Sequence, residues 1–224
     1  MAVILTGEEG AGSYLSRTSG PTATSFSASF WVKFTSLSGV YYTRLGQLEK
    51  IAITTENATL GWSSNTSGGV GTTTVNTTSW YHIGWTRNGN TQLVYLNGTQ
   101  ELSFSDSNSA TTWFLERTGY VGYGHGGRYA HLKLWDSVVL TGAEIQQEMW
   151  AARPIRGSGL WAWYPFIDSY TADKSGNARD WTAGSTPTLG DGPPVGWGAA
   201  PYVIGNPAAG RVIGPGTIWP TVTM

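Results

Sequence analysis

The chain has 224 residues, of which 40% are hydrophobic and only 12% are charged, and its formal net charge is −1. The 13 basic residues are scattered along the chain, which excludes nucleic-acid binding through a basic patch. The sequence has no cysteine, which excludes disulfides and thiolate chemistry, and no apolar run approaches the roughly 18 residues of a membrane-spanning helix.

Short apolar or alternating runs, separated by Gly, Asn, Ser and Thr, predict β-strands along most of the chain. In chain order these runs cover residues 3–5, 13–16, 27–34, 41–45, 50–54, 59–63, 72–76, 81–87, 93–96, 120–122, 129–135 and 160–166. Such regular spacing indicates an all-β fold in which two antiparallel sheets form a sandwich. In the run 25–34, apolar residues alternate with serines, Trp31 and Lys33, which predicts a half-buried strand.

The segment 79–100 predicts a β-hairpin that is rich in aromatic residues. One face is expected to lie in the core and carries Tyr81, Ile83 and Trp85. The other face carries Trp80, His82, Gly84 and Thr86, and Gly84 leaves space there. We therefore expect the His82 face to be the side of the hairpin that could meet a ligand or a neighbouring molecule.

One short helix is predicted at about 142–151. Thr141 is expected as its N-cap, and Glu144 three residues later completes a capping box. Apolar side chains at helical spacing form one stripe for docking on a sheet, made of Ile145, Met149 and Trp150.

The end of the chain differs from the rest, because proline and glycine recur every few residues from Thr186 onward. Proline excludes central strands and helices there, yet the stretch is more apolar than disordered tails usually are. We therefore predict a sandwich domain over 1–190 and an extended arm over 191–224 that packs on its own domain or on a neighbouring subunit. The contact residues expected in this arm are Trp197, Tyr202, Ile204, Ile213 and Trp219.

Four segments resemble, in order, the laminin-G-like jelly-roll domain of the concanavalin A-like lectin/glucanase superfamily. They read SFSASFWVKFTSLSG, SWYHIGWTRNGNTQLVYLNGTQ, GGRYAHLKLWDSVVLTGAEIQQ and GLWAWYPFIDSYTADKSGNARDWT. The resemblance covers roughly residues 15–185 and implies a jelly roll of two antiparallel sheets. Its members mostly bind carbohydrate or protein; some are glycosidases, and others are non-catalytic modules of bacterial surface proteins and phage structural proteins.

Glycosidase chemistry needs two carboxylates about 5–5.5 Å apart in a retaining enzyme. Glycosidases of this superfamily carry a Glu-x-Asp-x-x-Glu strand, and this sequence has no such run. Glu8 and Glu9 are adjacent, so a strand would point them to opposite faces, and Glu144 is used in the helix cap. We therefore expect no enzyme, although a pair assembled from distant loops stays open.

Two clusters are candidate sites. A glycine-rich loop offers stacking and hydrogen-bonding groups for a ligand, namely Tyr123, His125, Arg128 and Tyr129; alternatively, its glycines serve only to form turns. Calcium is common in the family, and oxygen ligands for it would come from Asp168, Asp173 and Asp180. The alternative reading of the second cluster is an Asx turn at 173–177.

Our leading functional prediction is a non-catalytic structural or adhesion module of a virion, such as a phage capsid-decoration or tail-associated protein. Its arm would dock on neighbouring subunits, in a homo-oligomer or a larger assembly. The alternative is a carbohydrate-binding module that contacts host or cell-surface glycans. Because the first residues lack a signal-peptide pattern, we expect a virion or an extracellular location, with no membrane or nucleic-acid partner and no cofactor other than calcium.

Overall fold

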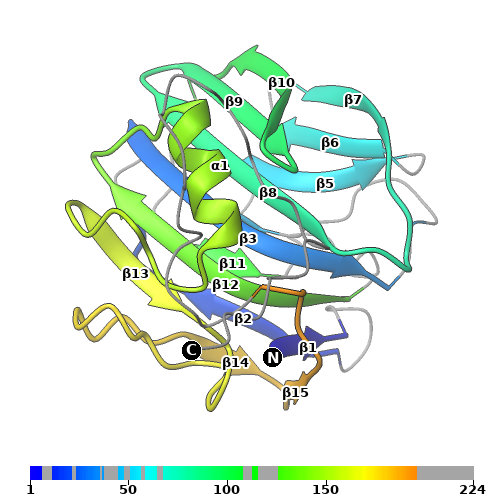
Figure 1. Ribbon diagram of the computed structural model, residues 1–224, viewed down its shortest axis with the longest axis vertical. Helices are drawn as coiled ribbons and strands as arrows, with labels where there is room; N and C mark the ends of the chain where they lie inside the picture. The colour runs from blue at the N-terminus through cyan, green and yellow to red at the C-terminus, as the bar shows by residue number, and fades with distance from the viewer. Residues whose placement is uncertain are drawn as a thin grey trace, which may run out of the picture.

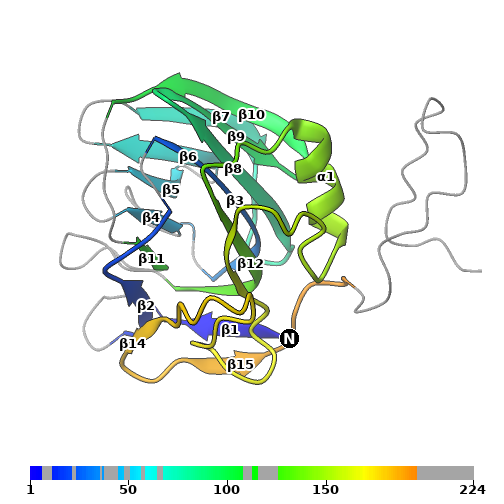
Figure 2. The same ribbon diagram turned by 90° about the vertical axis from the view of Figure 1, so that its left-hand side faces the viewer.

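The computed structural model describes residues 1–6, 12–21, 24–35, 37, 45–47, 51–56, 59–64, 68–107, 113–115 and 126–195. Within these residues, two antiparallel sheets lie face to face, and one helix covers the outer side of one sheet (Figures 1 and 2). The all-β fold and the two-sheet sandwich predicted from the sequence are confirmed. None of the helices in this part of the chain is long and apolar enough to cross a membrane.

The larger sheet, sheet A, has the strand order β10-β9-β8-β3-β12-β1-β15, and β13 also pairs with β12. Its strands are β1 (Ala2–Leu5), β3 (Ser25–Phe34), β8 (Tyr81–Asn88), β9 (Thr91–Leu96), β10 (Thr99–Ser105), β12 (Gly127–Asp136), β13 (Leu160–Tyr164) and β15 (Thr188–Gly190). Sheet B has the order β14-β2-β11-β4-β5-β6-β7. Its strands are β2 (Tyr14–Arg17), β4 (Leu45–Gln47), β5 (Ile51–Glu56), β6 (Thr59–Ser64), β7 (Gly68–Thr74), β11 (Trp113–Leu115) and β14 (Thr182–Gly184).

Most of the predicted runs coincide with these strands to within a few residues. The run 41–45 reaches the described residues only at Leu45, where β4 begins, and the run 120–122 lies outside them. The sequence does not predict β10, β11, β14 or β15. Three of these strands have only three residues, which is too short to show a period of two.

The core between the sheets is built from the inward faces of the central strands. Phe26 of β3 packs edge-to-face on Trp85 of β8, with ring centroids 4.8 Å apart, and on Trp113 of β11, at 5.2 Å. All three side chains are fully buried. The prediction for one face of the hairpin is confirmed, because Tyr81, Ile83 and Trp85 all belong to this core.

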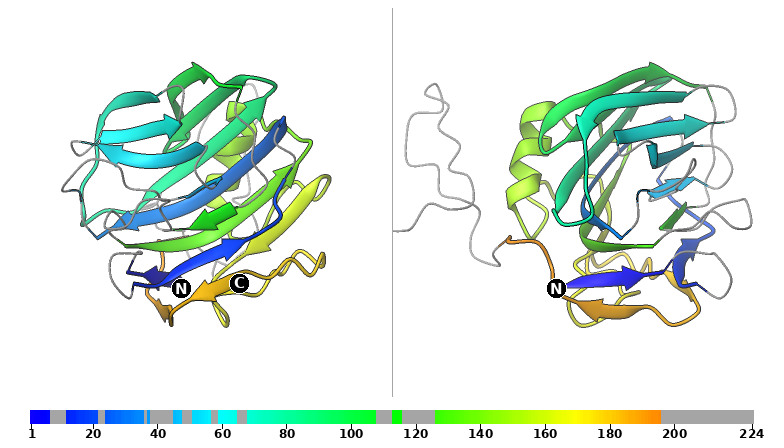
Figure 3. Two further views of the ribbon diagram at one scale, coloured as in Figure 1. Left: turned by 180° about the vertical axis from the view of Figure 1, so that it is seen from behind. Right: turned by 90° about the vertical axis from the view of Figure 1, so that its right-hand side faces the viewer.

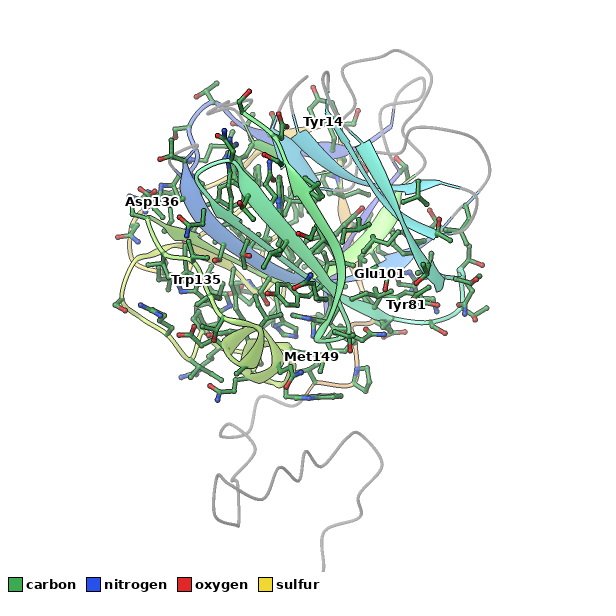
Figure 4. The ribbon with its side chains drawn as sticks, turned by 90° about the horizontal axis from the view of Figure 1, so that it is seen from above. Tyr14, Tyr81, Glu101, Trp135, Asp136 and Met149 are labelled. Atoms are coloured by element: carbon green, nitrogen blue, oxygen red, sulfur yellow. The ribbon has the colours of Figure 1, made fainter. Side chains whose placement is uncertain are left out.

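The helix α1 (Gly142–Trp150) begins as the sequence predicts. Thr141 Oγ1 accepts a hydrogen bond from Glu144 N at 3.2 Å, and Thr141 N donates to Glu144 Oε2 at 2.8 Å. These two bonds form the capping box, and α1 presents Ile145 and Met149 to sheet A. Figure 4 shows Trp135 and Met149 on the side of the sheet that carries α1.

The second face of β3 is also buried from Ser27 to Trp31, so the prediction of a half-buried strand is wrong over these residues. Ser27, Ser29 and Trp31 are at most 6% exposed, although they point away from the core between the sheets. The reason is α1, which packs on this outer side of sheet A (Figure 2). Trp31 Nε1 donates to Met149 O at 2.9 Å and so ties the strand to the end of the helix.

One lateral opening of the sandwich lies between β7 and β10, which are the edge strands of the two sheets. Glu101 of β10 spans it (Figure 4): its Oε1 accepts hydrogen bonds from Thr72 N at 2.5 Å and Thr73 N at 2.6 Å. Burial works to raise the pKa of the Glu101 carboxyl, but the hydrogen bonds from Thr73 and Thr72 outweigh it and lower the pKa. The carboxylate thereby satisfies backbone donors that an edge strand would otherwise leave unpaired.

The opposite edge of sheet A joins the first and last described strands, as Figure 3 shows beside the N-terminus. Beyond β15, Val195 packs against a small apolar cluster that includes Ala2 and Trp31. The arm residues Trp197, Tyr202, Ile204, Ile213 and Trp219 lie outside the described residues. The boundary between 1–190 and 191–224 therefore stays a prediction.

Candidate ligand-binding surface

The predicted ligand loop is only partly described. Tyr123 and His125 lie outside the described residues, whereas Arg128 and Tyr129 lie on β12. Tyr129 is fully buried, and its ring centroid lies 6.2 Å from that of Phe30 in the core. Successive residues of a strand point to opposite faces, so Arg128 points away from the core and is partly exposed. Tyr129 is thus a core residue, and Arg128 remains as a candidate ligand residue.

The three candidate calcium ligands do not form one group. Asp168 pairs with Lys174 at 3.1 Å, and its side chain is 65% exposed. Asp173 accepts hydrogen bonds from three backbone N–H groups, and Asp180 Oδ1 accepts one from Asp173 N at 2.8 Å. No group of three or more such side chains that could hold a metal occurs in the described residues. Each of the three carboxylates accepts from a donor of the protein, and within the described residues they do not form a calcium site.

The alternative reading of that cluster, an Asx turn, is confirmed at Asp173. Its Oδ1 accepts from Ser175 N at 2.8 Å, and its Oδ2 accepts from Arg179 N at 3.1 Å. The same Oδ1 accepts from Trp163 N at 2.9 Å, which ties the turn to β13. The Asp173 carboxylate therefore holds the β13–β14 connection against β13.

The His82 face of the hairpin is closed at His82 and Gly84, so the expectation that these positions could meet a ligand is wrong, whereas Trp80 on the same face is partly exposed. His82 is fully buried, its Nε2 lies 2.8 Å from Ser29 Oγ, and its ring lies 5.5 Å from Trp31. The space beside Gly84 is filled by the helix, because a Cβ there would lie 2.5 Å from Ile145 Cγ2. Burial and the nearby Lys133 ammonium hold the pKa of His82 well below its usual value, so the ring is neutral.

A buried ion pair fixes α1 on this face. Lys133 Nζ donates to Glu148 Oε2 at 2.7 Å, to Glu148 O at 2.9 Å and to Ala151 O at 2.6 Å. Glu148 Oε1 accepts from Ile155 N at 2.8 Å and from Arg156 N at 3.1 Å. Both side chains are 1% exposed, so this carboxylate has no access to a substrate. Desolvation lowers the pKa of Lys133, and Glu148 opposes that effect.

Outside the area under α1, the same outer side of sheet A carries a different set of residues. Lys33 of β3 pairs directly with Arg128 of β12, and Arg128 pairs with Ile4 of β1. Val32 pairs with Tyr81, which places Trp80 beside Lys33 at the start of β8. We call this set, Trp80, Lys33, Arg128 and Ile4, the Trp80 surface.

The Trp80 surface is partly exposed and its charges are unpaired. All four residues have intermediate exposure, and Trp80 rests on the cluster that contains Trp31. Within the described residues, neither the Lys33 ammonium nor the Arg128 guanidinium has a hydrogen bond or an ion pair. An aromatic ring beside free polar donors is a set of groups that can hold a polar ligand. Sequence reasoning named Arg128 as a ligand residue and placed Trp80 on the hairpin face that could meet a ligand, but it missed Lys33. That the three residues are neighbours follows only from strand register.

The comparisons with known proteins agree with this fold. Residues 8–146 match the laminin G family model described as the concanavalin A-like lectin/glucanases superfamily, and the chain belongs to that family. The resemblance stated from the sequence is thus confirmed. No curated protein matches the sequence significantly.

Three solved structures share the fold at low identity. A proposed carbohydrate-binding protein from Bacteroides ovatus has a TM-score of 0.63 at 16% identity, over 88% of this chain and 63% of that one. A native heptameric SAP-like pentraxin from Limulus polyphemus has a TM-score of 0.54 at 14% identity, over 82% of this chain and 94% of that one. The binding domain of Paraclostridial Mosquitocidal Protein 1 has a TM-score of 0.50 at 16% identity, over 66% and 43%. This chain therefore spans less than two thirds of the Bacteroides protein.

Proposed function

We propose that the chain is a non-catalytic carbohydrate-binding module and that the Trp80 surface is its binding site. The observation that carries the proposal is the adjacency of a partly exposed tryptophan to two unpaired cations, Lys33 and Arg128, on the open part of sheet A. The flat ring offers an apolar surface to a sugar face, and the two cations offer donors to its oxygens. Family membership and the fold shared with a proposed carbohydrate-binding protein support this function over the virion role.

Three glutamates of the described chain support the non-catalytic part of the proposal, because each is already used in the fold. Glu144 caps α1 and pairs with Arg156, Glu148 is buried against Lys133, and Glu101 accepts backbone hydrogen bonds from β7. A glycosidase needs two carboxylates that face a sugar at a short separation. These three side chains come from unconnected places and are each occupied by donors.

The virion role remains a separate prediction. It depends on an arm whose contact residues lie outside the described residues, and the fold of the heptameric pentraxin supports no particular assembly for this chain. Deleting residues 197–224 would test it: the predicted arm requires that the truncated protein stay folded and lose assembly. Normal assembly of the truncated protein would contradict the arm prediction.

The test of carbohydrate binding is a glycan array with the intact protein, followed by titration of the best ligand against Trp80→Ala. Loss of a central aromatic contact typically costs more than about 1–2 kcal/mol, which corresponds to about tenfold weaker binding. Because Trp80 also contacts the Trp31 cluster, Trp80→Phe and the melting temperature of each variant separate lost binding from lost folding. Lys174→Gln, an exposed cation in the β13–β14 connection, is the control and should bind normally. Full affinity in folded Trp80→Ala, or no ligand on a broad array, would overturn the proposal.

A further inference from the structure

We propose, as a refinement that rests on the carbohydrate-binding function above, that the Trp80 surface selects acidic saccharides, those that carry a carboxylate or a sulfate. The two central side chains of this surface, Lys33 and Arg128, are both cations. Lys33 and Arg128 are direct partners across the antiparallel β3–β12 pair and both point away from the core. Directly opposite residues in such a pair have Cβ atoms about 4.5–5.5 Å apart, and like charges there repel each other.

Most other cations of the described chain have a partner. Lys133, Arg156 and Lys174 each pair with a carboxylate. Arg17, Arg87 and Arg179 donate to backbone carbonyl oxygens. Among the described basic residues, Lys33, Arg128 and Arg153 have no side-chain partner, and only Lys33 and Arg128 lie side by side. An anion between those two would relieve their repulsion and gain attraction from both.

The chain's own arm does not supply that anion. Residues 196–224 contain a single charged side chain, Arg211, which is itself a cation. Asp191, the one acidic side chain of the arm, is exposed and makes no ion pair within the described residues. Within the described residues no carboxylate pairs with Lys33 or Arg128, so a bound anion would supply the countercharge that these two side chains lack there.

The neighbouring residues favour an acidic sugar over other anions. Arginine matches a planar carboxylate or a sulfate through two parallel hydrogen bonds, and lysine adds a point charge. Trp80, next to Lys33, offers its ring to the carbon face of the same or the next sugar unit. Two cations on a chain with a net charge of −1 are too few to hold a nucleic-acid backbone.

The experiment compares ligands that differ only in charge, using the intact protein. The probes are oligogalacturonate and its neutral methyl ester, sialyllactose and lactose, and a sulfated galactan and its desulfated form. We expect at least tenfold tighter binding of the acidic member of one pair, and the pair identifies carboxylate or sulfate as the source of the charge. That preference should shrink as salt is raised, because partly exposed charges are screened.

Variants connect the preference to the two residues. The double variant Lys33→Gln, Arg128→Gln should lose the tenfold preference but keep weak binding of the neutral member, whereas Lys174→Gln should keep the preference. Equal binding of acidic and neutral members by the native protein would overturn this inference and leave the carbohydrate-binding proposal standing. Binding of no saccharide at all would overturn both. Binding of polyglutamate as tightly as oligogalacturonate would overturn the assignment to saccharides.

Discussion

Removing either charge of the buried Lys133–Glu148 pair should destabilise the protein strongly. In Glu148→Gln the side chain keeps an oxygen for the Ile155 and Arg156 N–H groups, but Lys133 loses its countercharge at 2.7 Å. In Lys133→Met, the carboxylate and two backbone carbonyl oxygens lose their donor. Breaking a buried pair by removing one partner costs about 3–5 kcal/mol. For a chain of this size that is a fall in melting temperature of about 10 °C.

The two single variants should also differ in their pH dependence. Without Glu148, which raises the pKa of Lys133, the already lowered pKa of that ammonium falls further. The native state then binds fewer protons than the unfolded state, so Glu148→Gln gains stability as the pH rises toward the unfolded lysine pKa of about 10.4. Lys133→Met should not show this gain, because the titrating amine is gone.

The interaction free energy between Lys133 and Glu148 is measured by urea unfolding. The proteins compared are the two single variants and the double variant Lys133→Met, Glu148→Leu. The double variant should cost less than either single variant, because no unpaired charge remains buried. Arg156→Gln is the control: its pair with Glu144 has side chains 39% and 31% exposed and should contribute at most about 1 kcal/mol. Two results would refute the reasoning. One is that each single variant loses as little free energy of unfolding as the Arg156→Gln control. The other is that the double variant loses the sum of the two single-variant losses.

Three further predictions concern other parts of the fold. Gly84→Ala should lower the free energy of unfolding by about 1–3 kcal/mol, because its Cβ would lie 2.5 Å from Ile145 Cγ2. Adding Ile145→Ala removes that clash and should recover part of the native helix packing, as measured by near-UV circular dichroism. Burial, the Lys133 ammonium and the N-terminal amine lower the pKa of His131 to about 4, against an opposing hydrogen bond with Ala152. The neutral ring therefore stabilises the fold fully above pH 6.5. Up to about 3 kcal/mol of the free energy of unfolding is lost as the pH falls toward 4. Melting temperatures between pH 4 and 7 should therefore fall less for His131→Asn than for the native protein, since Asn tolerates the positive φ of 52°; parallel curves would contradict this. Glu101→Gln should lower the free energy of unfolding by about 1 kcal/mol at pH 7 and by less as the pH falls, because a lowered carboxyl pKa stabilises fully above the unfolded value and this contribution is lost as the pH falls through the folded value. A loss that does not change with pH would argue against the hydrogen bonds to β7.

Local sequence period predicted the inward faces of the strands well. Tyr81, Ile83 and Trp85 lie in the core as expected, and the capping box places the start of α1 correctly. A strand's alternation reports which residues share a face, and a cap reports where a helix begins, since both depend on neighbours in sequence.

The outer side of sheet A could not be predicted in this way. Whether Ser29 and His82 meet water or a helix depends on where α1 docks, which is a contact between segments more than 50 residues apart. The candidate site has the same origin, because Lys33, Trp80 and Arg128 are remote in sequence and become neighbours through the β3–β8 and β3–β12 registers. The glycine-rich loop motif predicts both Arg128 and Tyr129 as ligand residues. Because side chains alternate along β12, only Arg128 lies on the outer side of the sheet, and Tyr129 lies in the core.

The pairing of the first and last described strands has a mechanical consequence. Ala2 pairs with Gly190 and Ile4 with Thr188, so the chain enters and leaves this edge of the sandwich at the same point. The hydrogen bonds of an antiparallel pair run perpendicular to the strands. A force that pulls these two ends apart therefore loads the bonds one after another, as in a zipper, rather than all together in shear. Under tension β15 should peel away first, at low force, while the aromatic core between the sheets is still intact.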